Sequence, residues 1–113
     1  YRVRYGDVSF LITGDLIKEI EAQILREGID VSSTVLKVAH HGSATSSSEE
    51  FLRAVNPKCA VICVGYGNNF GHPRAEVIER LEKIHAKIYR TDIDGLIHFK
   101  TDGKNLNVTK FTN

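Results

Sequence analysis

The hydrophobic positions of the first half of the chain predict two strands, a helix and a further strand. Residues Arg2–Tyr5 and Val8–Thr13 are two β-type runs joined at Gly6-Asp7, which is typical of a tight hairpin. Leucines and isoleucines at helical spacing, Ile17 and Ile20 among them, predict a helix over residues 16–27. Residues 35–39 follow as a buried strand. This order of elements indicates an α/β fold.

The second half continues the alternation of helix and strand. Ser47 and Glu50 form a capping-box pattern that opens a helix through Val55, and Pro73 is expected at the first position of another helix. Cys59–Val64 is apolar on both faces, which predicts a central strand covered on both sides. A Gly/Asn-rich loop is expected over residues 65–71. Three shorter strands complete the pattern, at residues 87–90, 96–100 and 106–110. We therefore expect a single domain over residues 1–113, with a mixed sheet and about three helices.

Composition narrows the class of protein. The hydrophobic share of 42% fits a globular chain, and 15 Lys and Arg residues nearly balance 14 Asp and Glu residues. No basic stripe stands out, so charge alone does not argue for nucleic-acid binding. The longest apolar run, residues 60–64, is too short to span a bilayer. Because the sequence begins at Tyr1 and contains no Met, we expect it to be a piece of a longer protein.

Cys59 and Cys63 are expected to be structural. Residues four apart in one strand face the same side and lie about 13 Å from each other, which is too far for a disulfide. We therefore expect two thiols that fill space in the core.

Three polar segments carry the candidate chemistry. Thr13-Gly14-Asp15, His40-His41-Gly42-Ser43 and Gly71-His72-Pro73 each follow a β-type apolar run. Loops that leave the strands of α/β folds are where catalytic and binding side chains gather. Aspartate and histidine are metal-ligand types, so a metal site is the first interpretation. The three segments contain too few ligands to fill a site for two metal ions.

Asp15 can bridge two metal ions, because each carboxylate oxygen offers a lone pair to a different ion. The alternative is an N-cap of the helix that follows, and one residue could do both. His72 lies between a glycine and a proline, which restricts its backbone and favours a ligand role over that of a helix cap.

His40 and His41 are adjacent, so in an extended chain their side chains point in opposite directions. One is expected to face the site and the other to brace the strand or a neighbouring ligand. His41 is the better candidate for the site, because Gly42 lets the backbone open beside it. The alternative is a structural role, in which both are loop histidines that bond to Ser43 or Ser46.

Three strings together resemble the metallo-β-lactamase-like domain of ComEC-type DNA internalisation (competence) proteins. They are Leu-Lys-Val-Ala-His-His-Gly-Ser-Ala-Thr-Ser at 36–46, Gly-Tyr-Gly-Asn-Asn-Phe-Gly-His-Pro at 65–73 and Tyr-Arg-Thr-Asp-Ile-Asp-Gly at 89–95. The resemblance spans nearly the whole chain, and the combined pattern is specific although each piece alone is not.

The resemblance implies half of an αββα metallohydrolase sandwich. It implies that Asp15 bridges two metals, that His72 completes the shell of the second, and that His41, with His40 beside it, helps to bind or protonate the phosphate. The metals would be zinc or manganese, and the reaction would be hydrolysis of a phosphodiester, DNA or another, by a metal-activated water. The parent would be membrane-associated and this domain soluble, on a side of the membrane that the sequence does not identify.

The chain departs from that family at its start. The family's His-x-His-x-Asp-His motif is missing, and no histidine precedes Asp15. We therefore expect the C-terminal half of the domain, with weak or absent metal binding and little or no activity of its own. An apolar sheet face left open would bind the missing N-terminal half or a second copy of the chain. The alternative functions are another phosphoester hydrolase of the superfamily and a non-catalytic α/β binding module.

Overall fold

The computed structural model describes residues 1–65, 67 and 71–111, and it shows a mixed α/β fold. Its strands are β1 (Arg2–Tyr5), β2 (Val8–Ile12), β3 (Val35–Lys37), β4 (Cys59–Ile62), β5 (Lys87–Arg90), β6 (Leu96–Thr101) and β7 (Leu106–Phe111). The first five form one sheet in the order β1-β2-β3-β4-β5, in which β1 runs antiparallel to β2 and the other pairs are parallel. The last two strands form an antiparallel hairpin.

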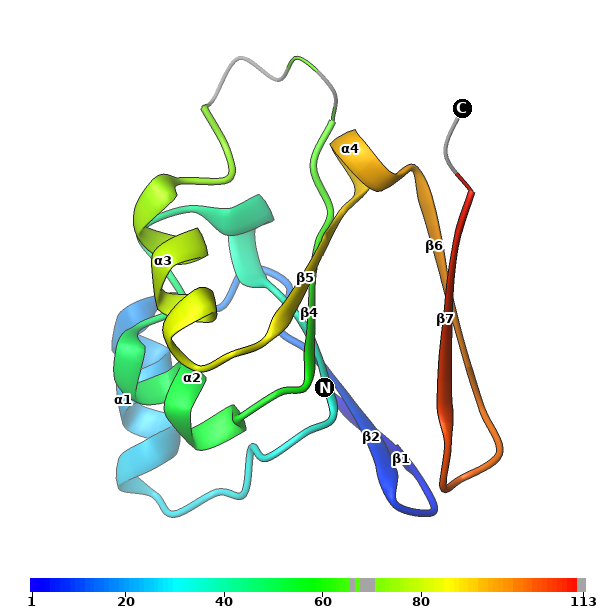
Figure 1. Cartoon of the computed structure of the whole chain (residues 1–113). Helices are drawn as coiled ribbons and strands as arrows, with labels where there is room; N and C mark the ends of the chain where they lie inside the picture. Colours follow the sequence, from blue (N-terminus) through cyan, green and yellow to red (C-terminus); the bar gives the residue numbers. More distant parts are fainter. Residues whose placement is uncertain (66, 68–70, 112–113) are drawn as a thin grey trace.

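The sheet lies between a layer of helices and the β6–β7 hairpin (Figure 1). Its described helices are α1 (Lys18–Arg26), the 3-10 segment η1 (Ala39–Gly42), α2 (Glu49–Val55), α3 (Ala75–Lys83) and the single turn α4 (Thr91–Asp94). Helices α1, α2 and α3 cover one face, where Leu36, Phe51, Leu52, Ile62 and Leu81 are almost completely buried. Burial of such side chains is the main stabilising contribution to a fold of this size.

The hairpin covers part of the opposite face. Val61 and Tyr89 are buried there, and Phe99 from β6 packs edge-to-face against Tyr89 and Phe10, with ring centroids 5.9 Å and 6.1 Å apart. Such edge-to-face pairs add to the stabilisation from area burial. Cys59 belongs to the same cluster as a buried free thiol. Strand β4 is buried along its whole length, as the apolar run at 59–64 predicts.

The mixed α/β class and the mixed sheet are confirmed. The part of the chain that the structure describes contains four α-helices, against the three expected, and the fourth is one turn long. The two hairpins lie where the sequence predicts them, and strand ends differ by a few residues at most. Most of the Gly/Asn-rich loop expected at 65–71 lies outside the described residues. No helix among the described residues is long and apolar enough to cross a membrane.

Two predicted helix starts are wrong. The N-cap of α2 is Ser48, whose hydroxyl accepts a hydrogen bond from Phe51 N at 3.2 Å, while Ser47 adopts a left-handed conformation with φ +61°. Helix α3 begins after its N-cap Arg74, so Pro73 precedes the helix instead of opening it. The two helices begin one and two residues later than the sequence patterns predict.

Helix α1 buries a carboxylate in addition to part of its apolar stripe. Ile24 and Leu25 pack against the core, as the helical spacing predicts. The fully buried residue is Glu21, whereas Ile17 and Ile20 are 38% and 42% exposed. The Glu21 carboxylate accepts hydrogen bonds from Ser47 N at 2.6 Å and Ser48 N at 2.9 Å. The Glu21 carboxylate therefore holds the loop before α2 from inside the fold.

Candidate functional site

The three polar segments converge at the carboxyl ends of β2, β3 and β4. Thr13-Gly14-Asp15 follows β2, η1 follows β3, and Gly71-His72-Pro73 leads from β4 into α3. The backbone N–H of His40 donates to Gly14 O at 3.0 Å, and Arg74 N donates to Gly42 O at 3.0 Å. Segment η1 is thus hydrogen-bonded both to the turn after β2 and to the start of α3. We refer to Asp15, His40, His41 and His72 together as the histidine edge.

His40 fixes the position of Asp15. Its Nε2 lies 2.7 Å from the backbone oxygen of Asp15, and because a carbonyl only accepts, Nε2 is the protonated nitrogen. Its Nδ1 lies 3.8 Å from a carboxylate oxygen of the same residue. The Asp15 side chain is 91% exposed, and the N-cap of α1 is Ile17. The structure therefore excludes the cap alternative for Asp15 and leaves its carboxylate open to a ligand.

His41 is exposed and held by one ring nitrogen. Its Nδ1 donates to the backbone oxygen of Cys63 at 2.5 Å, which leaves the lone pair of the neutral ring on Nε2. Nothing in the described part of the chain bonds to that Nε2. The two histidines therefore differ: His40 braces the turn that carries Asp15, and His41 faces outward.

The backbone of the histidine pair is strained. His40 and His41 both adopt left-handed conformations, with φ of +49° and +53°, where the sequence argument assumed extended geometry. Such conformations are uncommon for residues with a Cβ, and they cluster at functional sites. Two in succession reverse the chain tightly enough to bring Gly42 against Pro73.

His72 is half-buried, with its Nδ1 shielded from solvent. Burial lowers the pKa of His72, and the nearby positive charges of Arg74, His41 and His40 lower the pKa further. The N-cap of α3 is Arg74, so the helix-cap alternative for His72 is excluded as well. A neutral imidazole is the form that binds metals and accepts protons. His40 and His41 thus lie within electrostatic reach of His72.

Sequence reasoning missed Glu21 as a residue that shapes this region. It anchors Ser47 and Ser48 from α1, and Arg80 on α3 donates to Ser47 O at 3.1 Å. The available signal was a glutamate at a position that the helical period directs inward, four residues after Ile17. Buried carboxylates are rare unless paired or hydrogen-bonded, so such a position is worth noting in a sequence.

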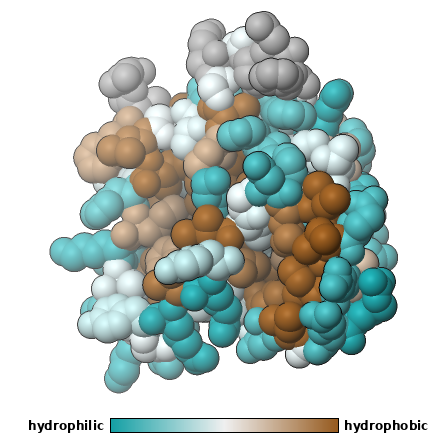
Figure 2. All heavy atoms as spheres, turned by 180° about the vertical axis from the view of Figure 1, so that it is seen from behind, coloured by the Kyte–Doolittle hydropathy of each residue, from teal (hydrophilic) through white to brown (hydrophobic). Residues whose placement is uncertain are grey.

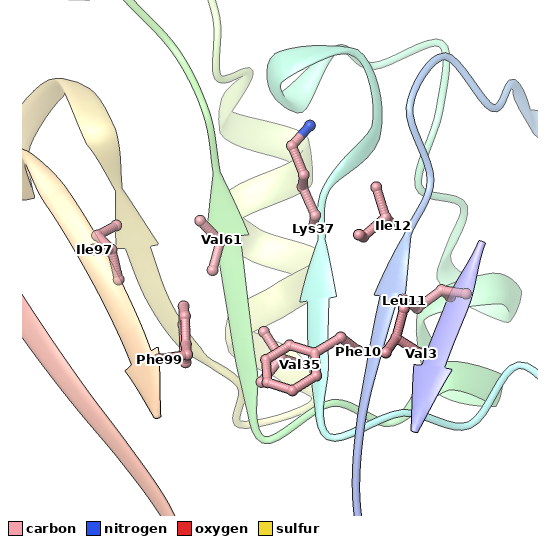
Figure 3. A pocket seen from close by; sticks show the side chains of 9 residues that line it. All are labelled: Val3, Phe10, Leu11, Ile12, Val35, Lys37, Val61, Ile97 and Phe99. Atoms are coloured by element: carbon pink, nitrogen blue, oxygen red, sulfur yellow. The ribbon is translucent and has the colours of Figure 1, made fainter. Parts of the chain in front are cut away.

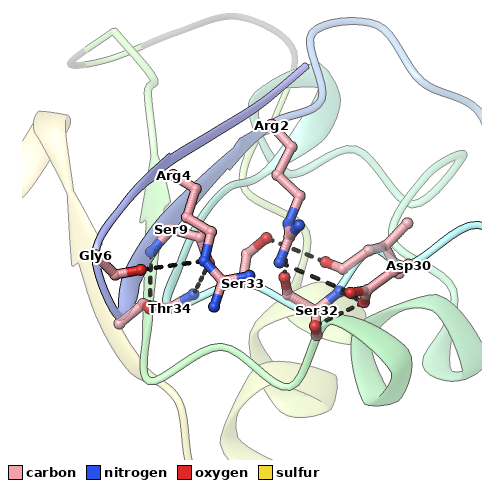
Figure 4. Close-up of polar contacts among 9 residues, drawn as sticks. Arg2, Arg4, Gly6, Ser9, Asp30, Ser32, Ser33 and Thr34 are labelled. Atoms are coloured by element: carbon pink, nitrogen blue, oxygen red, sulfur yellow. Dashed lines mark hydrogen bonds and ion pairs between the residues drawn. The ribbon is translucent and has the colours of Figure 1, made fainter.

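Two grooves are lined by residues outside the three polar segments. A polar groove at the opposite end of the sheet is lined by Arg2, Arg4 and Asp30, with Arg2 Nε donating to Ser32 O at 2.9 Å (Figure 4). An apolar groove of about 360 Å³ lies between the large sheet and the hairpin (Figure 3). In the described residues, the arginine side chains of the polar groove already bond to backbone carbonyls and to Asp30. The histidine edge is therefore the better candidate site.

The described residues do not contain a complete metal site. Across 1–65, 67 and 71–111, no group of three or more His, Cys, Asp and Glu side chains is arranged to hold a metal ion. The donors present are of the right chemical type, but in the described residues they are too few to hold an ion on their own.

Comparison with known proteins places the chain beside short segments of much longer proteins. It is 38% identical over 95 residues to ComE operon protein 3 of Bacillus subtilis, covering 84% of this chain and 12% of that protein. It is 42% identical over 99 residues to competence protein ComA of Neisseria gonorrhoeae, covering 87% and 14%. Recombination protein 2 of Haemophilus influenzae is 36% identical over 92 residues, covering 81% and 11%.

Neither a protein-family model nor a solved structure matches the chain. The chain spans between 11% and 14% of the length of these three relatives. It is thus similar to one segment of proteins whose names refer to competence and recombination.

Proposed function

We propose that this chain contributes part of a metal-dependent hydrolase site that acts on the phosphodiester bonds of DNA during DNA uptake. The supporting observation is the similarity to proteins named for competence and recombination, which extends over 81% to 87% of the chain. The gathering of Asp15, His40, His41 and His72 at one sheet edge agrees with such a site, because it brings anion-binding and metal-binding groups together.

The proposed division of roles follows the geometry. Asp15 and His72 offer a carboxylate and a neutral imidazole, which suit zinc or manganese, and such an ion would supply an activated water. His40 holds the Asp15 backbone, and His41 directs Nε2 outward, where it can donate a proton to, or accept one from, a phosphate oxygen. The remaining ligands would come from a preceding half-domain in a longer protein, as the size of the relatives allows.

Substituting Asp15 and His72 tests the metal role. In the full-length protein that carries this chain, Asp15→Ala and His72→Ala are each expected to reduce bound zinc or manganese. DNA cleavage should fall by about hundredfold or more, because each change removes a donor atom. Metal content by elemental analysis and cleavage of labelled DNA are the measurements. His85→Ala, an exposed histidine at the end of α3, is the matched control and should change neither.

The 113-residue chain alone should bind these ions weakly and show little or no turnover with Mn²⁺ or Zn²⁺ and a generic phosphodiester. Robust turnover by the isolated chain would contradict the division of the site. A second candidate function is a non-catalytic α/β binding module, which the absence of a third ligand among the described residues favours. Unchanged metal content in both alanine variants would support that module instead.

The apolar groove side of the sheet is proposed to bind a second copy of the chain when the preceding half-domain is absent. Val3, Tyr5 and Ile12 are 45%, 60% and 43% exposed, and hydrophobic side chains gather on the face shown in Figure 2. Val3 pairs in register with Phe10, so both strands present apolar side chains to this face. Exposed apolar patches of this kind mark interaction sites.

We expect the isolated chain to dimerise in the micromolar range, as measured by light scattering. Val3→Glu should shift it to monomer, because it places an unpaired charge in the apolar contact. Val3→Thr, which keeps the shape without a charge, should remain closer to wild type. A monodisperse monomer of the wild-type chain across that range would rule the association out.

A further inference from the structure

Lys37 is the cationic side chain of a groove whose other lining residues are apolar. The groove lies between strands β1–β4 and the hairpin, and its walls include Val3, Phe10, Val61 and Phe99 (Figure 3). An ammonium group gains nothing from such walls, whereas the methylene stem of lysine packs well on them. The stem therefore keeps contact with the groove while the charged end reaches past it.

The charged end points past the carboxyl end of β3, after which η1 begins. In Figure 3 the Lys37 side chain extends away from Val35, along the direction of β3 and toward the segment that follows the strand. Lys37 is the last residue of β3, pairs in register with Ile12, and accepts a hydrogen bond from Thr13 Oγ1 at 2.5 Å through its backbone oxygen. Its backbone is thus tied to the turn that carries Asp15.

The Lys37 ammonium has no counter-ion among the described residues. The side chain is half-buried, and no hydrogen bond or ion pair engages its Nζ in that part of the chain. Other cations are paired with carboxylates. Arg90 forms a bidentate ion pair with Asp92 at 2.8 Å and 3.1 Å, and Lys110 Nζ lies 3.4 Å from Asp94. A partly desolvated ammonium without a carboxylate favours an external anion.

We propose that the Lys37 ammonium contacts a phosphate oxygen of a DNA strand bound at the histidine edge. This inference rests on the function proposed above and adds a substrate-contacting residue to it. A phosphodiester carries one negative charge per phosphate, which matches a single point-charge donor. The apolar groove holds the stem extended, so little side-chain freedom remains to be lost when the anion binds.

The test measures binding of a short fluorescein-labelled oligothymidine by the full-length protein that carries this chain, using fluorescence anisotropy at several salt concentrations. Lys37→Met keeps the apolar stem and removes the charge, so it preserves packing in the groove. Lys37→Arg keeps the charge. Lys83→Gln, an exposed lysine in the last turn of α3, is the matched control for loss of one positive charge.

We expect Lys37→Met to weaken binding about fivefold or more. The slope of log Kd against log salt concentration should fall by about one, because one fewer counterion is released. Lys37→Arg and Lys83→Gln should stay close to wild type. If the wild type binds and Lys37→Met binds equally well, the lysine only covers the groove, and this inference is overturned while the proposed function stands. If the wild type does not bind the oligonucleotide, both are overturned together.

Discussion

Replacing Glu21 by alanine is expected to destabilise the chain by about 2–4 kcal/mol, a loss comparable to that of a large core truncation. The side chain is fully buried, and its carboxylate is the acceptor for the backbone N–H groups of Ser47 and Ser48. Alanine would leave both donors without their acceptor and would open a cavity beneath the loop. Urea unfolding followed by circular dichroism measures the effect as a change in the free energy of unfolding.

Two further variants test whether the loss of stability comes from the buried carboxylate. Glu21→Gln keeps the volume and one acceptor oxygen, so its loss should fall between wild type and Glu21→Ala. Glu19→Ala removes an exposed carboxylate from the same helix and should change stability by no more than about 0.5 kcal/mol. If Glu21→Ala unfolds at the same urea concentration as Glu19→Ala, the buried carboxylate does not hold the loop.

The strands were predictable from sequence because of their turn residues and their apolar runs. The β1–β2 hairpin is closed by a glycine turn, and β4 is apolar and buried at every position, as expected of a strand covered on both faces. The predicted ends of β2 and β3 extend past the observed ones, at Thr13 and at residues 38–39. There the chain leaves the ladder: the Thr13 hydroxyl bonds to Lys37 O, and η1 begins at residue 39.

The histidine edge was only partly predictable. The topology of parallel strands brings their carboxyl ends to one side of the sheet, so the proximity of three polar segments follows from the strand order alone. Different orientations of His40 and His41 were expected, but the left-handed backbone that produces them was not, because no local pattern favours two such residues in succession. The buried position of Glu21 depends on the loop that it binds, 26 and 27 residues further along the chain, and the helical period alone could not reveal that partner.

Replacing Gly42 by alanine is expected to disrupt the joint between η1 and the start of α3. A Cβ at residue 42 would lie 2.5 Å from Pro73 Cβ and 2.9 Å from its Cα, and the glycine has φ +87°. The backbone conformation costs alanine about 1 kcal/mol, and relief of the overlap adds about 1–3 kcal/mol. We therefore expect a loss of about 2–4 kcal/mol in urea unfolding.

Gly14→Ala separates the two contributions, because Gly14 also has a positive φ of +53° but a Cβ there would meet nothing within 4 Å. It should lose only the conformational part, about 1 kcal/mol. The excess loss at Gly42 then measures the close approach of residue 42 to Pro73, which neighbours His72. Movement of that contact should also shift the His72 ring resonances in NMR spectra of the Gly42 variant and leave them nearly unchanged in the Gly14 variant. Equal losses in the two variants would mean that the chain near Pro73 yields easily, and that the spacing of the histidines is not set by this glycine.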